Sequence, residues 1–276
     1  MPRGRPRTGE QGTWKVAAMD DPAPGRRAGM SSGTFTRGRR LAALLIAAPL
    51  VGACGGGDPG GRLDAAPPEL TRGQRLVVTT GDGVRLRPSD AGRAVTDPRI
   101  VSRWSRREDT WTLDLSCRDH DERCPRMPVI DVPAGVPVSV TARNAGIDVT
   151  GLTAEMDLTT VDGDITVDRS GGDDATVRLV TRNGSVRASG LRSGELRAET
   201  VNGDVSLGSA TSPTRLTATT ENGSVRVTLP SGTPSYDVTA TTRNGRTSVT
   251  VPTDTENARH RMTLGSVNGD VTAAHG

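Results

Sequence analysis

Residues 196–207 read LRAETVNGDVSL, and close variants of this stretch recur along the second half of the chain. Before the central Asn-Gly pair, apolar or small residues occupy every second position from Leu196 to Thr200, and after it they do so at Val205 and Leu207. Charged and polar residues fill the positions between them. An alternation with a period of two on both sides of a short turn predicts strand, turn and strand, each strand with one face buried.

The same unit occurs six times between residues 156 and 273. Its turns are Asp162-Gly163, Asn183-Gly184, Asn202-Gly203, Asn222-Gly223, Asn244-Gly245 and Asn268-Gly269. The six glycines are 21, 19, 20, 22 and 24 residues apart. A period near twenty residues indicates one supersecondary unit copied in series. An incomplete copy surrounds Asn144-Ala145-Gly146, and a more distant one surrounds Gly81-Asp82-Gly83.

Asn and Gly at the turns have a conformational interpretation. Tight two-residue turns need positive φ angles, which Gly adopts freely and Asn tolerates. We therefore expect left-handed backbone at these pairs.

The fold class predicted for residues 72–273 is all-β. The approximately 20-residue period favours a β-solenoid-like stack of strand–Asn-Gly-turn–strand units. The alternative is an antiparallel meander or sandwich of hairpins, because it places the same residues on the same faces. With one Tyr and one Phe in the chain, the core must consist of Val, Leu, Ile, Ala and Thr.

The residue after each turn glycine bears on this choice. In chain order these residues are Asp164, Ser185, Asp204, Ser224, Arg246 and Asp270, so neighbouring units never both carry Asp. If the units stack about 4.8 Å apart, equivalent side chains form columns in which adjacent like charges repel. The alternation is therefore what a stack predicts.

The N-terminal part of the chain has the pattern of an export signal. Arg39-Arg40 precedes ten mostly apolar residues, 41–50, which are too few to span a bilayer. Val51-Gly52-Ala53-Cys54 resembles the bacterial lipobox, in which the cysteine is lipidated and becomes the new N-terminus. The alternative is a cleaved secretory signal followed by an incidental cysteine.

The chain therefore divides into an N-terminal extension (1–29), a lipoprotein signal peptide (30–53), a flexible Gly/Pro-rich tether (54–71) and the repeat domain (72–273). Met1, Met19 and Met30 are alternative start sites, and the Arg-Arg pair leaves both general and twin-arginine export open. We expect a mature protein attached to the extracytoplasmic face of the cell membrane by lipid on Cys54.

The overall charge of +3 comes from the leader. Residues 1–53 hold nine of the 35 Lys and Arg and three of the 32 Asp and Glu, so the remainder has 26 basic and 29 acidic residues, a net −3. A domain with that balance and few aromatic residues lacks the features of nucleic-acid binders. We expect no nucleic-acid partner.

Two cysteines remain in the repeat domain. Cys117 and Cys124 enclose six residues, and outside the membrane such a pair forms a disulfide. A metal site that includes His120 is the rival interpretation, but it has one ligand too few for a tetrahedral set. Acidic residues next to turn glycines suggest calcium repeats, yet a period of twenty does not fit them. We expect no metal and no cofactor.

Trp104 and Trp111 lie on either side of a predicted hairpin. The pair fits two roles, a platform for stacking sugars or a cover over the open end of the strand stack. The second role is favoured.

Val132-Pro-Ala-Gly135 followed by serial Thr-x-Asn-Gly-Asp/Ser-Val/Ile units resembles the DUF4097 family of adhesin-like β-strand-repeat proteins, over roughly residues 72–273. The resemblance implies a β-solenoid-like stack without catalytic residues. It also implies an association of some members with envelope-stress systems.

The function expected is a non-catalytic binding or scaffold module at the cell envelope, with envelope proteins or cell-wall glycans as partners. The alternative is a carbohydrate-active β-solenoid enzyme. An enzyme would need three acidic or basic side chains converging in a groove, whereas the repeats predict ladders of Thr and Asn.

Overall fold

The computed structural model describes residues 68–91, 93–96, 100–117, 125–256 and 258–276. The chain divides into two units, Met1–Cys54 and Gly55–Gly276, of which only the second contains described residues. The predicted signal peptide, Cys54, most of the tether and Cys124 lie outside the described residues. The backbone of Cys117 ends a strand, and its side chain is not described.

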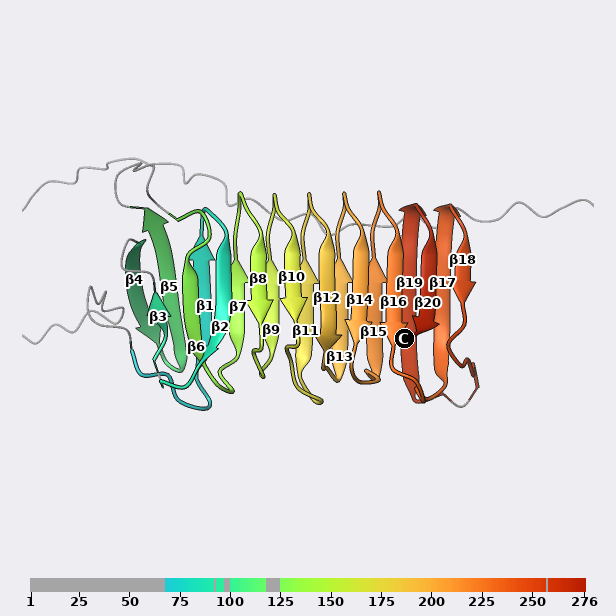
Figure 1. Cartoon of the computed structure of the whole chain (residues 1–276), viewed down its shortest axis with the longest axis horizontal. Helices are drawn as coiled ribbons and strands as arrows, with labels where there is room; N and C mark the ends of the chain where they lie inside the picture. The colour runs from blue at the N-terminus through green and yellow to red at the C-terminus, as the bar shows by residue number, and fades with distance from the viewer. Residues whose placement is uncertain (1–67, 92, 97–99, 118–124, 257) are drawn as a thin grey trace, which may run out of the picture. The chain divides into compact units, whose positions relative to one another are not determined.

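The described residues form two ten-stranded sheets and no helix (Figure 1). Sheet 1 contains, in spatial order, β17 (Tyr236–Asn244), β19 (His260–Asn268), β15 (Arg215–Thr219), β13 (Glu195–Glu199), β11 (Thr176–Val180), β9 (Met156–Thr159), β7 (Val138–Thr141), β1 (Arg75–Thr80), β5 (Thr110–Cys117) and β4 (Ile100–Arg107). Sheet 2 contains, in spatial order, β18 (Thr247–Val249), β20 (Val271–His275), β16 (Val225–Leu229), β14 (Val205–Ser209), β12 (Val186–Leu191), β10 (Ile165–Asp168), β8 (Ile147–Thr150), β2 (Val84–Ser89), β6 (Val129–Pro133) and β3 (Val95–Thr96).

Parallel pairing distinguishes the stack from the meander. The two strands of one repeat lie in different sheets, and each pairs in parallel with the equivalent strand of the next repeat, as in Leu196 with Leu216 and Val205 with Val225. The solenoid-like stack is therefore confirmed. Within the described part of the chain, no segment forms a helix long and apolar enough to cross a bilayer.

We call one strand of sheet 1 and the following strand of sheet 2 a layer. Apart from β3 and β4, the described strands make nine layers, which span roughly 38 Å at about 4.8 Å per layer. The spatial order is β5/β6, β1/β2, β7/β8, β9/β10, β11/β12, β13/β14, β15/β16, β19/β20 and β17/β18.

The stacking order differs from the chain order at both ends. The first layer of the chain, β1/β2, lies between β5/β6 and β7/β8. The last layer, β19/β20, lies between β15/β16 and β17/β18. The assumption that neighbouring repeats in the sequence are neighbours in space is therefore wrong for the last two repeats.

The core is a thin layer of aliphatic side chains between the sheets. In each central repeat the alternating positions are buried, for example Leu196, Ala198, Val205 and Leu207, whose exposed fractions are at most 2%. This confirms the alternation. At the β17/β18 end Thr247 is exposed although its position predicts burial, because no layer covers it.

An antiparallel hairpin covers the other end of the stack. β4 and β5 pair antiparallel around a turn in which Glu108 has a φ of 53°. Trp104 and Trp111 are 2% and 8% exposed, and their rings meet edge to face with centroids 6.5 Å apart. The covering role predicted for this pair is confirmed.

Candidate functional site

The Asn-Gly turns of successive layers align along one edge of the stack, and there they form three hydrogen-bonded ladders. We call this the turn edge. It contains all twelve turn residues identified from the sequence.

The first ladder joins side-chain amides. Each Asn donates its Nδ2 hydrogen to the Oδ1 of the previous layer at 2.7–2.9 Å. The series runs Asp162, Asn183, Asn202, Asn222, Asn268 and Asn244. An amide both donates and accepts, so it can repeat indefinitely, whereas a carboxylate only accepts. Asp162 therefore begins the ladder.

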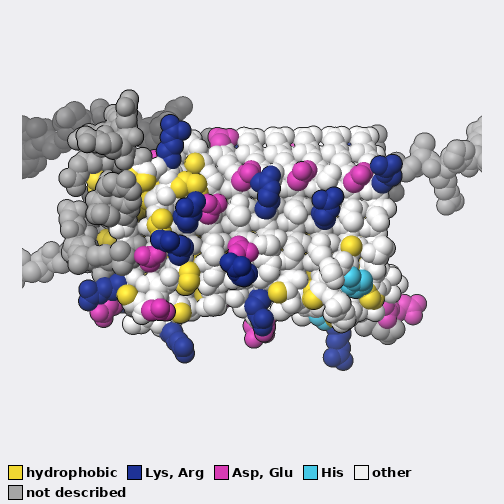
Figure 2. Space-filling model, in the orientation of Figure 1, with side chains coloured by type: hydrophobic (Ala, Val, Ile, Leu, Met, Phe, Trp, Pro, Cys, Tyr) yellow, Lys and Arg dark blue, Asp and Glu magenta, His cyan; other side chains and the backbone are white. Residues whose placement is uncertain are grey.

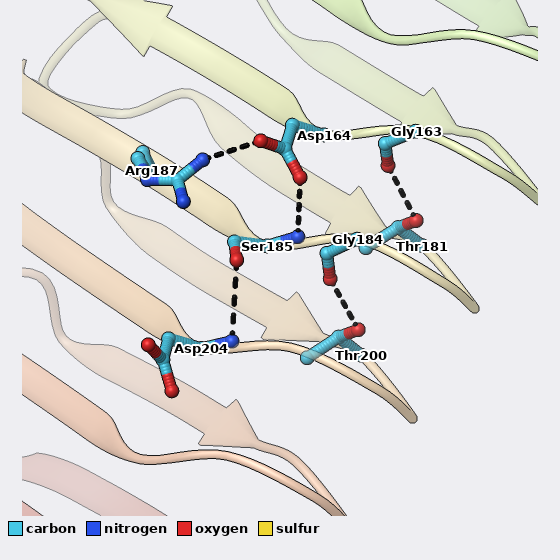
Figure 3. Close-up of polar contacts among 8 residues, drawn as sticks. All are labelled: Gly163, Asp164, Thr181, Gly184, Ser185, Arg187, Thr200 and Asp204. Carbon is cyan, nitrogen blue, oxygen red and sulfur yellow. Dashed lines mark hydrogen bonds and ion pairs between the residues drawn. The ribbon is translucent and has the colours of Figure 1, made fainter.

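The second ladder joins hydroxyls to backbone carbonyls. Thr181 Oγ1 donates to the carbonyl of Gly163 at 2.8 Å, and Thr200 Oγ1 donates to that of Gly184 at 2.7 Å (Figure 3). The same bond recurs at Thr160, Thr220, Ser266 and Thr242. Apart from Thr242 in the last layer, which is partly exposed, the side chains that donate these bonds are buried, so the bonds satisfy hydroxyls with little access to water.

Glycine is required at these turns by close approach of the layers. A Cβ on Gly184 would lie 2.1 Å from the carbonyl oxygen of Gly163, and one on Gly203 would lie 2.2 Å from that of Gly184. The expectation of left-handed Asn is wrong, since the only non-glycine residues with positive φ in the described part of the chain are Glu108 and Arg169. The turns link two sheets rather than two antiparallel neighbours, so they need no left-handed pair.

The third ladder uses the residue after each glycine. Asp164 Oδ1 accepts the backbone N–H of Ser185 at 2.7 Å, and Ser185 Oγ accepts that of Asp204 at 3.4 Å (Figure 3). Ser224, Asp270 and Arg246 continue the series in that spatial order. Asp and Ser thus alternate in adjacent layers, and acidic and basic side chains alternate along one face of the stack in Figure 2.

The sequence contained an overlooked signal for the swapped layers. Each member of the third ladder must accept a hydrogen bond from the next layer, and the Arg side chain has no acceptor. Arg246 can therefore occupy only the last position, with Asp270 between it and Ser224. Asp270 Oδ2 also lies 4.0 Å from the Arg246 guanidinium.

Electrostatics favour the charged form of Asp164. Partial burial alone would raise its pKa, but the N–H of Ser185 and the guanidinium of Arg187, 2.5 Å away, outweigh that effect. The pKa of Asp164 is consequently lowered from its ordinary value.

Arg–carboxylate pairs connect neighbouring layers on the outer faces as well. Representative pairs are Arg85–Asp148, Arg178–Asp157 and Arg192–Asp173, at 2.7–3.0 Å. Their side chains are 33–61% exposed, so each pair contributes at most about 1 kcal/mol to stability. A shallow open depression on sheet 2, lined by Thr166, Arg187, Ser189 and Ser206, interrupts the otherwise flat face.

His260 and Tyr236 form a cluster with the backbone just before β15. The His260 ring packs edge to face on Tyr236 with centroids 5.2 Å apart, and its Nδ1 lies 3.1 Å from the carbonyl oxygen of Pro213. Tyr236 is fully buried and donates to that same oxygen at 2.7 Å. Burial raises the pKa of Tyr236. Nothing in the repeat pattern indicated this cluster, because Tyr236 and His260 lie nine residues before their turn glycines, outside the alternating positions that define the repeat.

The described residues bear on the metal prediction only in part and do not test the disulfide prediction. No group of three or more His, Cys, Asp or Glu suited to a metal lies within the described ranges. Since Cys124 and His120 fall outside them and the Cys117 side chain is not described, the disulfide stays a prediction.

A family model matches part of the chain. Residues 137–273 match the family model described as Toastrack DUF4097. These residues form a DUF4097 domain. The match begins just before β7, so the layers β1/β2 and β5/β6 precede the segment that defines the DUF4097 family.

Two solved structures are similar over most of their length. One is a candidate cell adhesion protein from Clostridium sporogenes, with 10% identity, a TM-score of 0.33, and 79% of this chain and 99% of that chain covered. The other is a candidate adhesin from Bacteroides fragilis, with 15% identity, a TM-score of 0.40, and 76% and 95% covered. Both are too distant to support an inference about this chain. No curated protein matches it.

Proposed function

We propose that this DUF4097 protein is an exported, lipid-anchored envelope protein whose β unit acts as an adhesin-like, non-catalytic binding and scaffold module. The observation that carries the proposal is the use of the turn-edge polar groups. The Asn amides and Thr hydroxyls bond from layer to layer, so they hold the stack together instead of converging on a substrate.

The outer faces are the surfaces available to a partner. Every second residue of each strand points outward, and on sheet 2 Arg187 and Arg226 lie two layers apart, with Asp164 paired to Arg187. A flat surface with charges repeating at about 10 Å suits an extended partner, such as a glycan chain or an envelope protein. The lipobox at Cys54 supports display at the membrane surface.

The anchor is tested by expressing the native chain and Cys54→Ala in a bacterial host. We expect the native chain to gain a lipid-sized mass and to sediment with membranes, and the variant to do neither. A native chain that is unlipidated and soluble would overturn the anchor.

Binding is tested with purified full chain and isolated cell-wall and envelope fractions. We expect Arg187→Ala together with Arg226→Ala to weaken binding, and Arg75→Ala on sheet 1 to serve as the matched control. An equal loss of binding in the Arg75→Ala control would contradict the assignment of the binding face to sheet 2. Cleavage of envelope polysaccharide by the native chain would instead support the enzyme alternative.

A further inference from the structure

The two ends of the stack differ in whether another strand can join them. At one end β4 and β3 run antiparallel to β5 and β6 and cover them. At the other end β17 has a neighbouring strand, β19, on one side only. We call the β17/β18 end the open end.

The backbone of β17 is available along its middle. On its free side Tyr236 alone is paired, through hydrogen bonds to Pro252 and Asp254. Alternate residues of a parallel strand direct their peptide groups to opposite sides. The peptide groups of Val238, Ala240 and Thr242 therefore point outward from the stack, as those of Tyr236 do.

The open end also exposes core residues. Val238, Ala240 and Val249 pack on the core but are only partly buried, whereas Met262 and Leu264, their equivalents one layer inside, are fully buried. An edge strand with an apolar flank is a site for pairing with another strand.

The charge pattern of β17 identifies the partner. Asp237 and Arg243 lie on the same outward face of the strand, each three residues from Ala240, and Asp237 also makes an exposed pair with Arg261 of its own chain at 3.3 Å. If β17 pairs antiparallel with β17 of a second copy about a two-fold axis through Ala240, Asp237 of each copy faces Arg243 of the other. Val238 then faces Thr242, and Thr239 faces Thr241. Opposite charges and Thr pairs across antiparallel strands stabilise pairing, and the two-fold axis repeats each pair.

Pairing of the open end with the capped end of another molecule is less favourable. The edge strand β4 presents Arg103, Arg106 and Arg107, which are like charges to Arg243 and Arg246. Isologous pairing also closes after two molecules, because it consumes both open ends.

We propose that the protein forms a two-fold dimer through β17 and β18 at its open end. The chain enters the stack at β1, one layer from the capped end, so in this dimer the two N-terminal connections lie at opposite extremes. If the anchor proposed above holds, the dimer joins molecules on two facing membranes. The inference thus names a partner for the adhesin-like module, namely a second copy.

The test compares two charge reversals in the unlipidated full chain, Cys54→Ala, by sedimentation velocity over a concentration series. Arg243→Glu places two acidic residues opposite each other twice, and Asp237→Arg does the same with basic residues. We expect each variant alone to dimerise at least about tenfold more weakly than the parent. An equimolar mixture restores both opposite-charge pairs, so it should dimerise like the parent.

The mixture also controls for folding, since a chain that had failed to fold would not be rescued by its counterpart. Arg182→Glu, an exposed reversal far from the open end, is the control and should leave dimerisation unchanged. A monomeric parent at all concentrations, dimerisation insensitive to the reversals, or a mixture that stays monomeric would each overturn the dimer.

Vesicles that carry the lipidated native chain test the arrangement on facing membranes. We expect them to cluster, as seen by light scattering, and we expect vesicles with Arg243→Glu to cluster only when mixed with vesicles carrying Asp237→Arg. Failure of the Cys54→Ala fractionation would remove the anchor and leave the dimer standing. A monomeric unlipidated chain would remove the dimer and leave the anchor standing.

Discussion

The capped end and the open end of the stack terminate the same repeat in opposite ways. At the capped end the strand direction reverses at β4, and Trp104 fills the space over the last aliphatic layer with only 2% of its surface exposed. At the open end the parallel order simply stops at β17, and Val238 and Ala240 stay partly exposed. The contrast shows that a parallel stack has no intrinsic end, and that here its core is covered only where the strand direction changes and a large side chain packs over the last layer.

The largest expected effect is at the capped end. Trp104→Ala removes a buried aromatic ring that packs on Trp111, and we expect a loss of about 3–5 kcal/mol in the free energy of unfolding. Val238→Ala at the open end is the control and should cost about 1 kcal/mol or less, because its site is partly exposed. Urea denaturation followed by circular dichroism measures both. Equal losses of unfolding free energy in the two variants would mean that Trp104 covers the core no better than Val238 does.

A second experiment contrasts the interior of the turn edge with an uncrowded turn. In Gly203→Ala the new Cβ would lie 2.2 Å from the carbonyl oxygen of Gly184 in the preceding layer, and the φ of Gly203 is 151°. We expect a loss of about 2–4 kcal/mol, because the layers must separate. Gly81→Ala has nothing within 4 Å of its new Cβ and should change stability by less than about 1 kcal/mol. Thermal unfolding distinguishes the two, and a stable Gly203→Ala would contradict the close-approach explanation.

The amide ladder offers a smaller version of the same comparison. Asn202 both donates and accepts, whereas Asn244, in the last layer, only donates. Asn202→Ala should therefore destabilise by about 1–2 kcal/mol and Asn244→Ala by about half as much. Chemical denaturation of the two variants in parallel measures both losses of unfolding free energy. A larger loss for Asn244→Ala than for Asn202→Ala would contradict the view that the number of amide hydrogen bonds determines the contribution of each Asn.

The smallest effect concerns pH at Asp164. Its pKa is lower in the folded than in the unfolded chain, so its contribution to stability is fully present above the unfolded pKa. That contribution disappears as the pH falls through the folded pKa, below about pH 4. Asp164→Asn should accordingly be less stable than the native chain near pH 7, with the difference shrinking below pH 4. If the stability difference between Asp164→Asn and the native chain persisted unchanged in acid, the contribution of Asp164 would come from packing instead of its charge.

Much of the fold was predictable because the same alternation of buried and exposed residues recurs in six units. The alternation around Asn202-Gly203 indicates which side chains are buried, and the Asp–Ser alternation after the glycines indicates stacking. The order of the last two layers was not predicted, since the repeats around Gly245 and Gly269 have the same alternation. Two residues distinguish them, Arg246, whose side chain has no acceptor, and Thr247, which is polar at an inward position. The Tyr236–His260 contact would arise in either order, because β17 and β19 are neighbours in both, but nothing in the repeat pattern specifies it.

The interleaved terminal layers have a mechanical consequence. A pull on the N-terminal side of the chain reaches β1, which is hydrogen-bonded to β5 on one side and β7 on the other. Tension along β1 must shear two rows of backbone bonds together, whereas tension on a strand at the edge of a sheet opens one row bond by bond. β20 is held in the same way between β16 and β18. Since the rate of unfolding governs survival under force, a chain threaded in this way is suited to carrying tension applied through the segment that precedes β1.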